Sequence, residues 1–168
     1  KVLVNIATGA LMAAVMNAGS NGLNQIYDLE IDRINKPARP LPSGRLKLAE
    51  AWRFTVLTLA IGLVLAWLVN RECLMMAVAA ALLTACYSVP PVRTKRWGVL
   101  ASLTIAVPRG LLLPVAGWST VKTIAQPEPW LLGIPLGLFV FGAFATKGFS
   151  DIAGDLAGGC RTLPVRYG

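Results

Sequence analysis

The sequence contains no histidine, three widely separated cysteines and few acidic residues. These absences exclude a histidine-based catalytic triad, a zinc-ligand cluster and a disulfide framework. Charged residues make up 14% of the 168 positions and hydrophobic residues 55%, whereas soluble domains carry roughly 25% charged residues. The chain is therefore predicted to lie in a membrane, and any metal ion that it binds should have oxygen ligands.

Five long apolar runs recur along the chain, each close to the roughly 20 residues needed to cross a bilayer. A spanning segment must satisfy its own backbone hydrogen bonds, and the alternating pattern of barrel strands is absent, so the runs are expected to be helices. The sequence thus predicts an all-α, multi-spanning membrane helical bundle with five transmembrane helices. The expected helices cover residues 2–22, 51–69, 73–89, 98–118 and 130–149.

Lysine and arginine, 16 in all, give the chain a net charge of +8 and indicate its orientation. Most of them lie after the first run, between the third and fourth runs, and after the fifth, which are connections on one side of the membrane. The positive-inside rule places this side in the cytoplasm. Basic flanks also contact anionic membrane lipids. No basic patch is interleaved with aromatic residues, so nucleic acid is not an expected partner.

Two pairs of aspartates stand out among the 8 acidic residues. Asp28 and Asp32 follow the first apolar run, Asp151 and Asp155 follow the last, and each pair has i, i+4 spacing. Asn24 continues the first pair along the same helix face. Two carboxylates at this spacing repel each other unless a cation lies between them. Since both pairs are expected on the cytoplasmic face, they predict one composite cation site.

Paired carboxylates at a membrane surface suit Mg²⁺, which is usually held by one or two carboxylates together with substrate phosphates. Four carboxylates and two Mg²⁺ ions sum to about zero, so a diphosphate of charge about −3 needs further cations. If the diphosphate carries an isoprenoid chain, its tail can lie between the apolar helices. Metal-assisted loss of the diphosphate would then give an allylic cation. Basic candidates near the aspartates are Lys36, Arg39, Arg93, Lys95, Lys147 and Arg161.

Two other classes of protein fit the same carboxylates. An ion-coupled transporter would use them to bind coupling ions, and a membrane lipid diphosphate hydrolase would use the same metals with water as the acceptor. The shared face of both aspartate pairs counts against a transporter, because transporter ion sites usually lie near the middle of the bilayer.

The residues around the aspartates resemble a known family. Residues 24–32 read NQIYDLEID, which fits the pattern NxxxDxxxD, and residues 151–155 read DIAGD. Between them, residues 87–96 read YSVPPVRTKR, similar to a tyrosine-containing loop. In this order and spacing, the three motifs resemble the UbiA superfamily of intramembrane prenyltransferases over essentially the whole chain.

The resemblance implies an enzyme that transfers a prenyl group from a polyprenyl diphosphate to an acceptor with the help of Mg²⁺. Its metal ligands would be Asn24, Asp28, Asp32, Asp151 and Asp155, of which the four aspartates would be the catalytic residues and Asn24 would also bind substrate. Diphosphate contacts would come from Lys36, Arg39, Lys95 and Arg161, and Lys147 and Tyr87 complete the set of substrate-binding candidates.

The resemblance also bears on the extent of the domain and on the acceptor. Family members have nine helices around a central cavity, with both motifs in cytoplasmic loops. Residues 1–168 would be part of a single prenyltransferase membrane domain, and their five helices would correspond to the second through the sixth. The first motif is most similar to homogentisate prenyltransferases, whereas the segments near Tyr87 and Arg161 are similar to chlorophyll synthases and archaeal-type ether-lipid enzymes. The acceptor is thus aromatic or lipid, with a slight preference for an aromatic head group.

Two residues allow more than one interpretation. Arg109 lies inside the fourth apolar run, where an arginine is costly. It would either line a cavity and meet the acceptor or the diphosphate, or bond carbonyl groups freed by Pro108. Tyr87 would either shield the allylic cation or belong to the aromatic belt at the membrane interface.

Overall fold

The computed structural model describes residues 1–168, with the side chains of all except Ala145 and Lys147. The described residues contain five helical spans long and apolar enough to cross a membrane, which confirms the predicted bundle. The first, second and fourth spans extend beyond the predicted runs, by five residues at the end, three at the start and one at the end, respectively. The third and fifth each begin two residues earlier than predicted and end one and two residues earlier. The spans are α1 (Val2–Tyr27), α3 (Leu48–Val69), α4 (Arg71–Ser88), the segment Gly98–Ser119, and α7 (Glu128–Lys147).

The fourth span is not a continuous α-helix. It consists of α5 (Gly98–Ala106), a π-helical segment η2 (Val107–Leu112) and α6 (Leu113–Ser119). Pro108 lies at the start of the π-helical segment and has no N–H to donate to the preceding turn. Segments of this kind are rare and frequently lie at functional sites.

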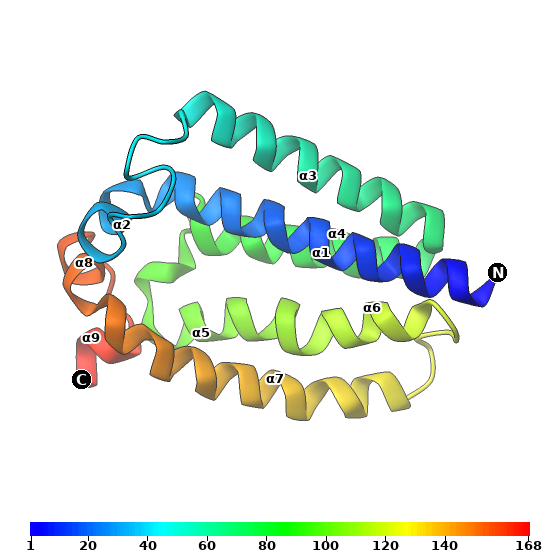
Figure 1. The fold of residues 1–168 in the computed structure, drawn as a ribbon. Helices are drawn as coiled ribbons and strands as arrows, with labels where there is room; N and C mark the ends of the chain where they lie inside the picture. Colours follow the sequence, from blue (N-terminus) through cyan, green and yellow to red (C-terminus); the bar gives the residue numbers. More distant parts are fainter.

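The long helices run side by side, and the short helices gather at one end of the bundle (Figure 1). The N-terminus lies at the opposite end from the C-terminus. We refer to the end that holds the short helices as the motif end. Its elements are α2 (Leu29–Asn35), η1 (Thr94–Arg96), η3 (Gly148–Asp151), α8 (Ile152–Ala157) and α9 (Leu163–Tyr167).

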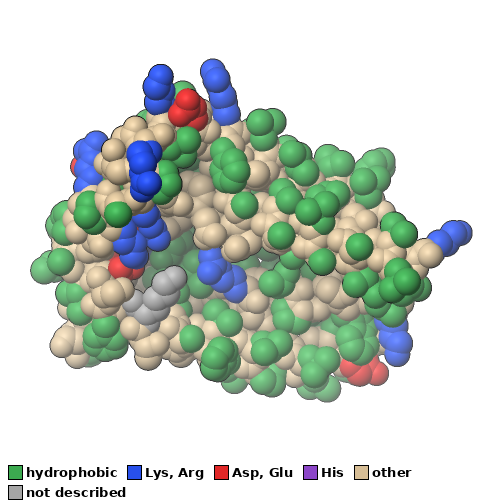
Figure 2. Space-filling model, viewed as in Figure 1, with side chains coloured by type: hydrophobic (Ala, Val, Ile, Leu, Met, Phe, Trp, Pro, Cys, Tyr) green, Lys and Arg blue, Asp and Glu red, His purple; other side chains and the backbone are tan. Residues whose placement is uncertain are grey.

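The surface of the bundle differs between the motif end and the spans. Lysine and arginine side chains gather at the motif end, while apolar side chains cover most of the rest of the visible face (Figure 2). Leu3 and Phe139, for example, are 82% and 72% exposed. Exposed side chains of this kind suit contact with lipid tails, so this surface agrees with a multi-pass membrane protein.

Close packing between spans depends on small residues. A Cβ atom at Gly110 would overlap the backbone of Gly137, so the π-helical segment and α7 approach each other without side chains between them. Ala66, Cys73 and Ala77 form a buried cluster between α3 and α4. Within a membrane the hydrophobic effect does not drive helices together, so their association depends on close packing. Small residues allow the helix backbones to approach closely enough for such packing.

The first span departs from the prediction at the aspartate pair. The expected stripe of polar residues assumed one continuous helix through Asp32, but α1 ends at Tyr27 and Asp28 adopts a turn conformation with φ −102° and ψ 16°. The helical hydrogen bonds continue across the break, from the Asp28 N–H to Asn24 and from the Asp32 N–H to Asp28. The regular helix is therefore interrupted at Asp28, while the two aspartates remain one turn apart.

Candidate active site

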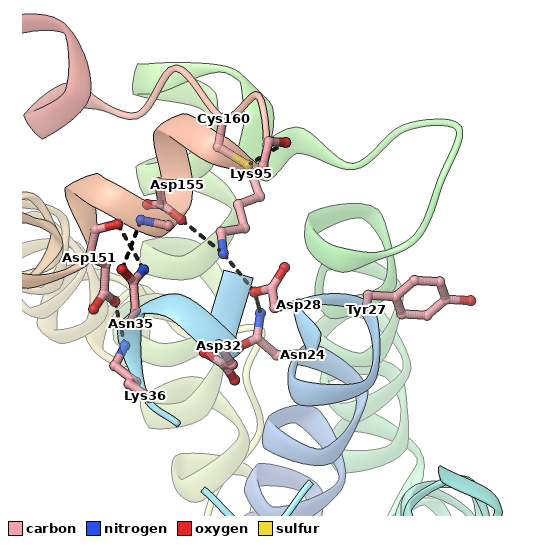
Figure 3. Close-up of polar contacts among 12 residues, drawn as sticks. Asn24, Tyr27, Asp28, Asp32, Asn35, Lys36, Lys95, Asp151, Asp155 and Cys160 are labelled. Atoms are coloured by element: carbon pink, nitrogen blue, oxygen red, sulfur yellow. Dashed lines mark hydrogen bonds and ion pairs between the residues drawn. The ribbon is translucent and has the colours of Figure 1, made fainter. Parts of the chain in front are cut away.

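The four aspartates meet at the motif end although more than a hundred residues separate the two pairs in sequence. Asp28 lies at the junction of α1 and α2, Asp32 within α2, Asp151 at the end of η3 and Asp155 within α8. All four line one cavity of about 290 Å³. The close-up shows them distributed along α2, with Asp28 near its start and Asp151 near its end (Figure 3). The expectation that the two pairs face each other in one composite site agrees with this arrangement.

The first pair is deeply buried and each carboxylate has its own cation. Asp28 is 2% exposed and accepts from Lys95 at 2.7 Å and from Arg93 at 3.2 Å. The Asn24 side-chain amide donates to Asp28 Oδ2 at 2.7 Å, the same oxygen that accepts from Lys95. Asp32, 3% exposed, accepts from Arg39 at 2.5 Å. These contacts offset the repulsion expected between two carboxylates one turn apart.

The second pair depends on residues of the first motif. The Lys36 ammonium donates to Asp151 at 2.5 Å. The side chains of Lys36 and Asp151 are 29% and 21% exposed, so water reaches this ion pair. Asp155 is buried, and its Oδ1 lies 3.2 Å from the Lys95 ammonium without accepting a hydrogen bond from any described residue.

Lys95 lies between the two aspartate pairs and contacts one member of each, Asp28 and Asp155 (Figure 3). It is carried by the short helix η1 and is itself buried. Burial works to lower the pKa of Lys95, but the carboxylates of Asp28 and Asp155 outweigh burial and raise the pKa above its ordinary value. The ammonium is therefore a fixed positive charge at the centre of the site.

Asn35 holds the second motif against the first. Its side-chain amide donates to the backbone carbonyl of Asp151, and its carbonyl accepts from the backbone N–H of Gly154, both at 2.8 Å. A Cβ atom at Gly154 would lie 2.5 to 2.7 Å from the Asn35 side chain. A Cβ atom at Gly158 would lie 2.6 Å from the Ile31 side chain. These two glycines therefore allow α8 to lie close to α2.

The structure brings together most, though not all, of the predicted substrate-binding residues. Lys36, Arg39, Lys95 and Tyr87 line the cavity. Arg161 does not: its backbone pairs with Arg96 and Gly98, and its side chain is exposed. The side chain of Lys147 lies outside the described residues.

Two contributors were not assigned a role by sequence reasoning. Asn35 had no predicted role, and Arg93 was named only as a basic residue near the aspartates. No local pattern marks Asn35, because its partners lie more than a hundred residues away in the sequence. The backbone of Arg93 lies in the left-handed region, with φ 33°, where a non-glycine residue is uncommon and worth a functional interpretation.

The oxygen-rich donor set suits a hard cation such as Mg²⁺. The buried Asp155 Oδ1 accepts no hydrogen bond from the described residues, and its charged neighbour is the Lys95 ammonium at 3.2 Å. Among these residues, however, no three acidic, histidine or cysteine side chains form a ready metal site. The expected ligand set of Asn24 and the four aspartates is therefore not a complete protein cage. A cation here would need oxygens from a bound substrate, which is the usual mode for Mg²⁺.

A second, apolar cavity of about 90 Å³ lies beside the first. The two cavities share four lining residues, Ser20, Thr84, Ile105 and Arg109. The apolar part is lined mainly by methionine, alanine and leucine side chains, among them Met12, Met16, Met76, Ala77 and Leu112. The charged cavity at the motif end thus adjoins an apolar cavity inside the bundle. Such an arrangement suits a ligand with a polar head and a hydrocarbon tail.

Comparison with known proteins decides the family. The model of the UbiA prenyltransferase family matches residues 2–168. The chain belongs to this family. The resemblance drawn from the three motifs is therefore confirmed.

The similar UbiA proteins differ in their named products. Over 151 residues the chain is 36% identical to a digeranylgeranylglyceryl phosphate synthase of Methanocaldococcus jannaschii, covering 90% of this chain and 51% of that protein. It is 33% identical to the synthase of that name from Methanoculleus marisnigri, covering 95% and 56%. A homogentisate phytyltransferase of Synechocystis is 30% identical, covering 98% and 56%. The chain thus spans about half the length of the curated relatives it matches.

Solved structures agree on the UbiA fold. A structure described for digeranylgeranylglyceryl phosphate synthase in membranes superposes with a TM-score of 0.78 at 32% identity, covering 99% of this chain and 57% of that one. A UbiA homolog from Archaeoglobus fulgidus, bound to DMAPP and Mg²⁺, superposes with a TM-score of 0.79 at 23% identity, covering 98% and 58%. These known structures contain more of the fold than this chain does.

Proposed function

We propose that the full-length protein transfers a prenyl group from a polyprenyl diphosphate to a glycerophosphate-type lipid acceptor, with Mg²⁺ as cofactor. The observation that carries the proposal is the charged cavity at the motif end and the apolar cavity that adjoins it inside the bundle. Four aspartates suit the metal ions, the basic side chains suit a diphosphate, and the apolar space suits a prenyl tail.

The cavity as described holds a balanced set of charges that a substrate would rearrange. Four carboxylates are paired with four cations, from Lys36, Arg39, Arg93 and Lys95. When bound, Mg²⁺ ions would neutralise the departing diphosphate. The aspartates, with Asn24, would turn from their basic partners to the metal ions. Lys36, Arg39 and Lys95 would then be free to donate to phosphate oxygens, as charge-assisted hydrogen bonds of this kind are strong.

The transfer itself breaks the carbon–oxygen bond of the donor, and the electron pair leaves with the diphosphate. An acceptor hydroxyl oxygen forms the new bond to the same carbon and loses its proton to a phosphate oxygen or water. Buried walls must exclude bulk water, since water would capture the cation instead. The ring of Tyr87, 7% exposed and lining the cavity, is placed to shield that cation.

The acceptor is where this proposal departs from the sequence analysis, which leaned slightly to an aromatic head group. The first seven similar proteins are named digeranylgeranylglyceryl phosphate synthase, at 29% to 36% identity. A product of that name carries two geranylgeranyl groups on glyceryl phosphate. The matching acceptor is a glycerophosphate that already carries one chain. We further infer that the motif end faces the cytoplasm, supported by its gathered lysines and arginines.

The test is product analysis with the full-length protein in lipid nanodiscs. Geranylgeranyl diphosphate and Mg²⁺ are supplied with a geranylgeranylated glycerophosphate, with homogentisate, or with no acceptor, and products are identified by mass spectrometry. We expect a doubly prenylated glycerophosphate, and no product once EDTA removes the metal. Prenylated homogentisate as the main product would overturn the lipid acceptor. Free prenyl alcohol in every reaction would indicate the hydrolase. Ion flux across liposomes that contain the protein, without diphosphate release, would indicate the transporter.

A further inference from the structure

Arg109 lies at the junction of the charged and apolar cavities, and it lines both. It belongs to the π-helical segment η2, between the buried residues Pro108 and Gly110. Its guanidinium donates to the side-chain oxygen of Asn21 at 3.3 Å. Of the two interpretations left open by the sequence, the structure favours the cavity-lining one.

The charge environment of Arg109 differs from that of the other cations in the cavity. Lys36, Arg39, Arg93 and Lys95 each contact an aspartate. Among the described side chains, no carboxylate lies within ion-pair distance of Arg109. An arginine within a membrane span is costly and is normally paired or placed at a water-filled path for a ligand. This guanidinium has an amide partner where an anion would be more favourable.

The depth of Arg109 separates it from the aspartates. Its partner Asn21 precedes Asp28 by seven residues of α1 and its C-terminal turn, which corresponds to about 10 Å along the helix axis. A diphosphate held by the aspartates therefore lies nearer to Lys36, Arg39 and Lys95 than to Arg109. A second anionic group, located deeper than the diphosphate, would suit the guanidinium.

We propose that Arg109 binds the anionic head group of the acceptor, a phosphate monoester, and thereby selects charged acceptors over neutral ones. This inference rests on the proposed function, in which donor and acceptor each bring a phosphate group into the same space. The planar guanidinium matches a phosphate through two parallel hydrogen bonds. The bound phosphate also neutralises the guanidinium charge, which would otherwise repel the allylic cation that forms nearby.

The test compares acceptors that differ only in charge. Full-length wild type, Arg109→Gln and Arg109→Lys in nanodiscs are assayed with the phosphorylated prenylglycerol and with its dephosphorylated alcohol. We expect Arg109→Gln to lower kcat/KM for the phosphorylated acceptor by about 100-fold, as for a lost charge-assisted hydrogen-bond pair. The rate with the neutral alcohol and the KM for the donor should stay within about threefold, and Arg109→Lys should recover part of the loss. Arg71→Gln, an exposed charge at the start of α4, is the matched control.

Two outcomes would overturn the assignment. Equal losses with the charged and the neutral acceptor would mean that Arg109 only supports the fold, and a raised donor KM with unchanged acceptor selectivity would assign it to the diphosphate.

Binding without donor separates this inference from the proposed function. A fluorescent phosphorylated prenylglycerol should bind Arg109→Gln at least about tenfold more weakly than wild type, and equal Kd values would refute the inference. A wild type that binds this lipid in an Arg109-dependent way but transfers no prenyl group would instead refute the proposed function.

Discussion

The first aspartate motif follows the end of the long helix α1, whereas the second spans the two short helices η3 and α8. Asp28 and Asp32 draw partners from their own surroundings, Asn24 one turn earlier and Arg39 in the following loop. Only Lys95 and Arg93 come from a distant segment. The geometry of the first motif is therefore largely decided by the local chain.

The second motif has the opposite character. Asp151 is paired with Lys36, and its backbone carbonyl with Asn35, both from the first motif. Asp155 meets Lys95. The second motif is thus positioned by the first, and changes to α2 should affect both motifs, while changes to α8 should leave the first intact.

The largest effects are expected for substitutions of the aspartates, which should slow the reaction in both motifs but lower the thermal stability only in the first. Asp28→Asn and Asp151→Asn in the full-length protein should each lower the rate of prenyl transfer by at least about 100-fold, because each removes a charge that would hold the metal and diphosphate. Asp28→Asn should also lower the thermal unfolding midpoint, because it leaves Lys95 and Arg93 without that buried carboxylate. Asp151→Asn should leave the midpoint nearly unchanged, since Lys36 is partly solvated. Near-normal rates in both variants would refute the proposed site.

A smaller effect is expected where α8 meets α2. Gly154→Ala places a methyl group against the Asn35 side chain, so the second motif should shift and the rate should fall about tenfold. Gly142→Ala is the matched control, because nothing lies within 4 Å of its added Cβ atom. Hydrogen exchange should show faster exchange in α8 for Gly154→Ala and no change in α2.

A double variant sharpens the interpretation of Gly154. Asn35→Ala alone removes two hydrogen bonds to the second motif and should also slow the reaction. Both changes act on the same contact. The rate of the double variant Asn35→Ala, Gly154→Ala should therefore fall by a smaller factor than the product of the two single decreases. Fully independent losses would show that the contact does not position the second motif.

The smallest effect is expected at Arg161, although sequence resemblance implies a diphosphate contact there. Its side chain is exposed and is not among the residues that line the cavity. Arg161→Gln should therefore change kcat/KM by less than about threefold, as surface substitutions usually do, whereas Arg39→Gln should reduce it strongly. A loss with Arg161→Gln comparable to that with Arg39→Gln would show that Arg161 reaches the substrate.

Part of the site followed from the sequence because acidic residues are scarce in it. Asp28, Asp32, Asp151 and Asp155 make up half of the 8 acidic residues, and their spacing marked them as pairs. The basic partners could not be ranked in the same way. Lys95 and Arg161 are both basic residues in connections, and spacing does not indicate which side chain turns toward the aspartates. Asn35 carried no signal of its own, because its role depends on a backbone more than a hundred residues away.

The sequence by itself determined the five spans and placed both aspartate pairs at the same end of the bundle. A bilayer requires long apolar helices, and such helices appear in the sequence as apolar runs of about 20 residues. Only the tertiary structure decided that Lys95 lies between the two aspartate pairs, that Asn35 holds α8, and that Arg109 lines both cavities. These features depend on where loops and helix ends meet in space. That meeting is set by packing at positions such as Gly154 and Gly158, and not by any local pattern.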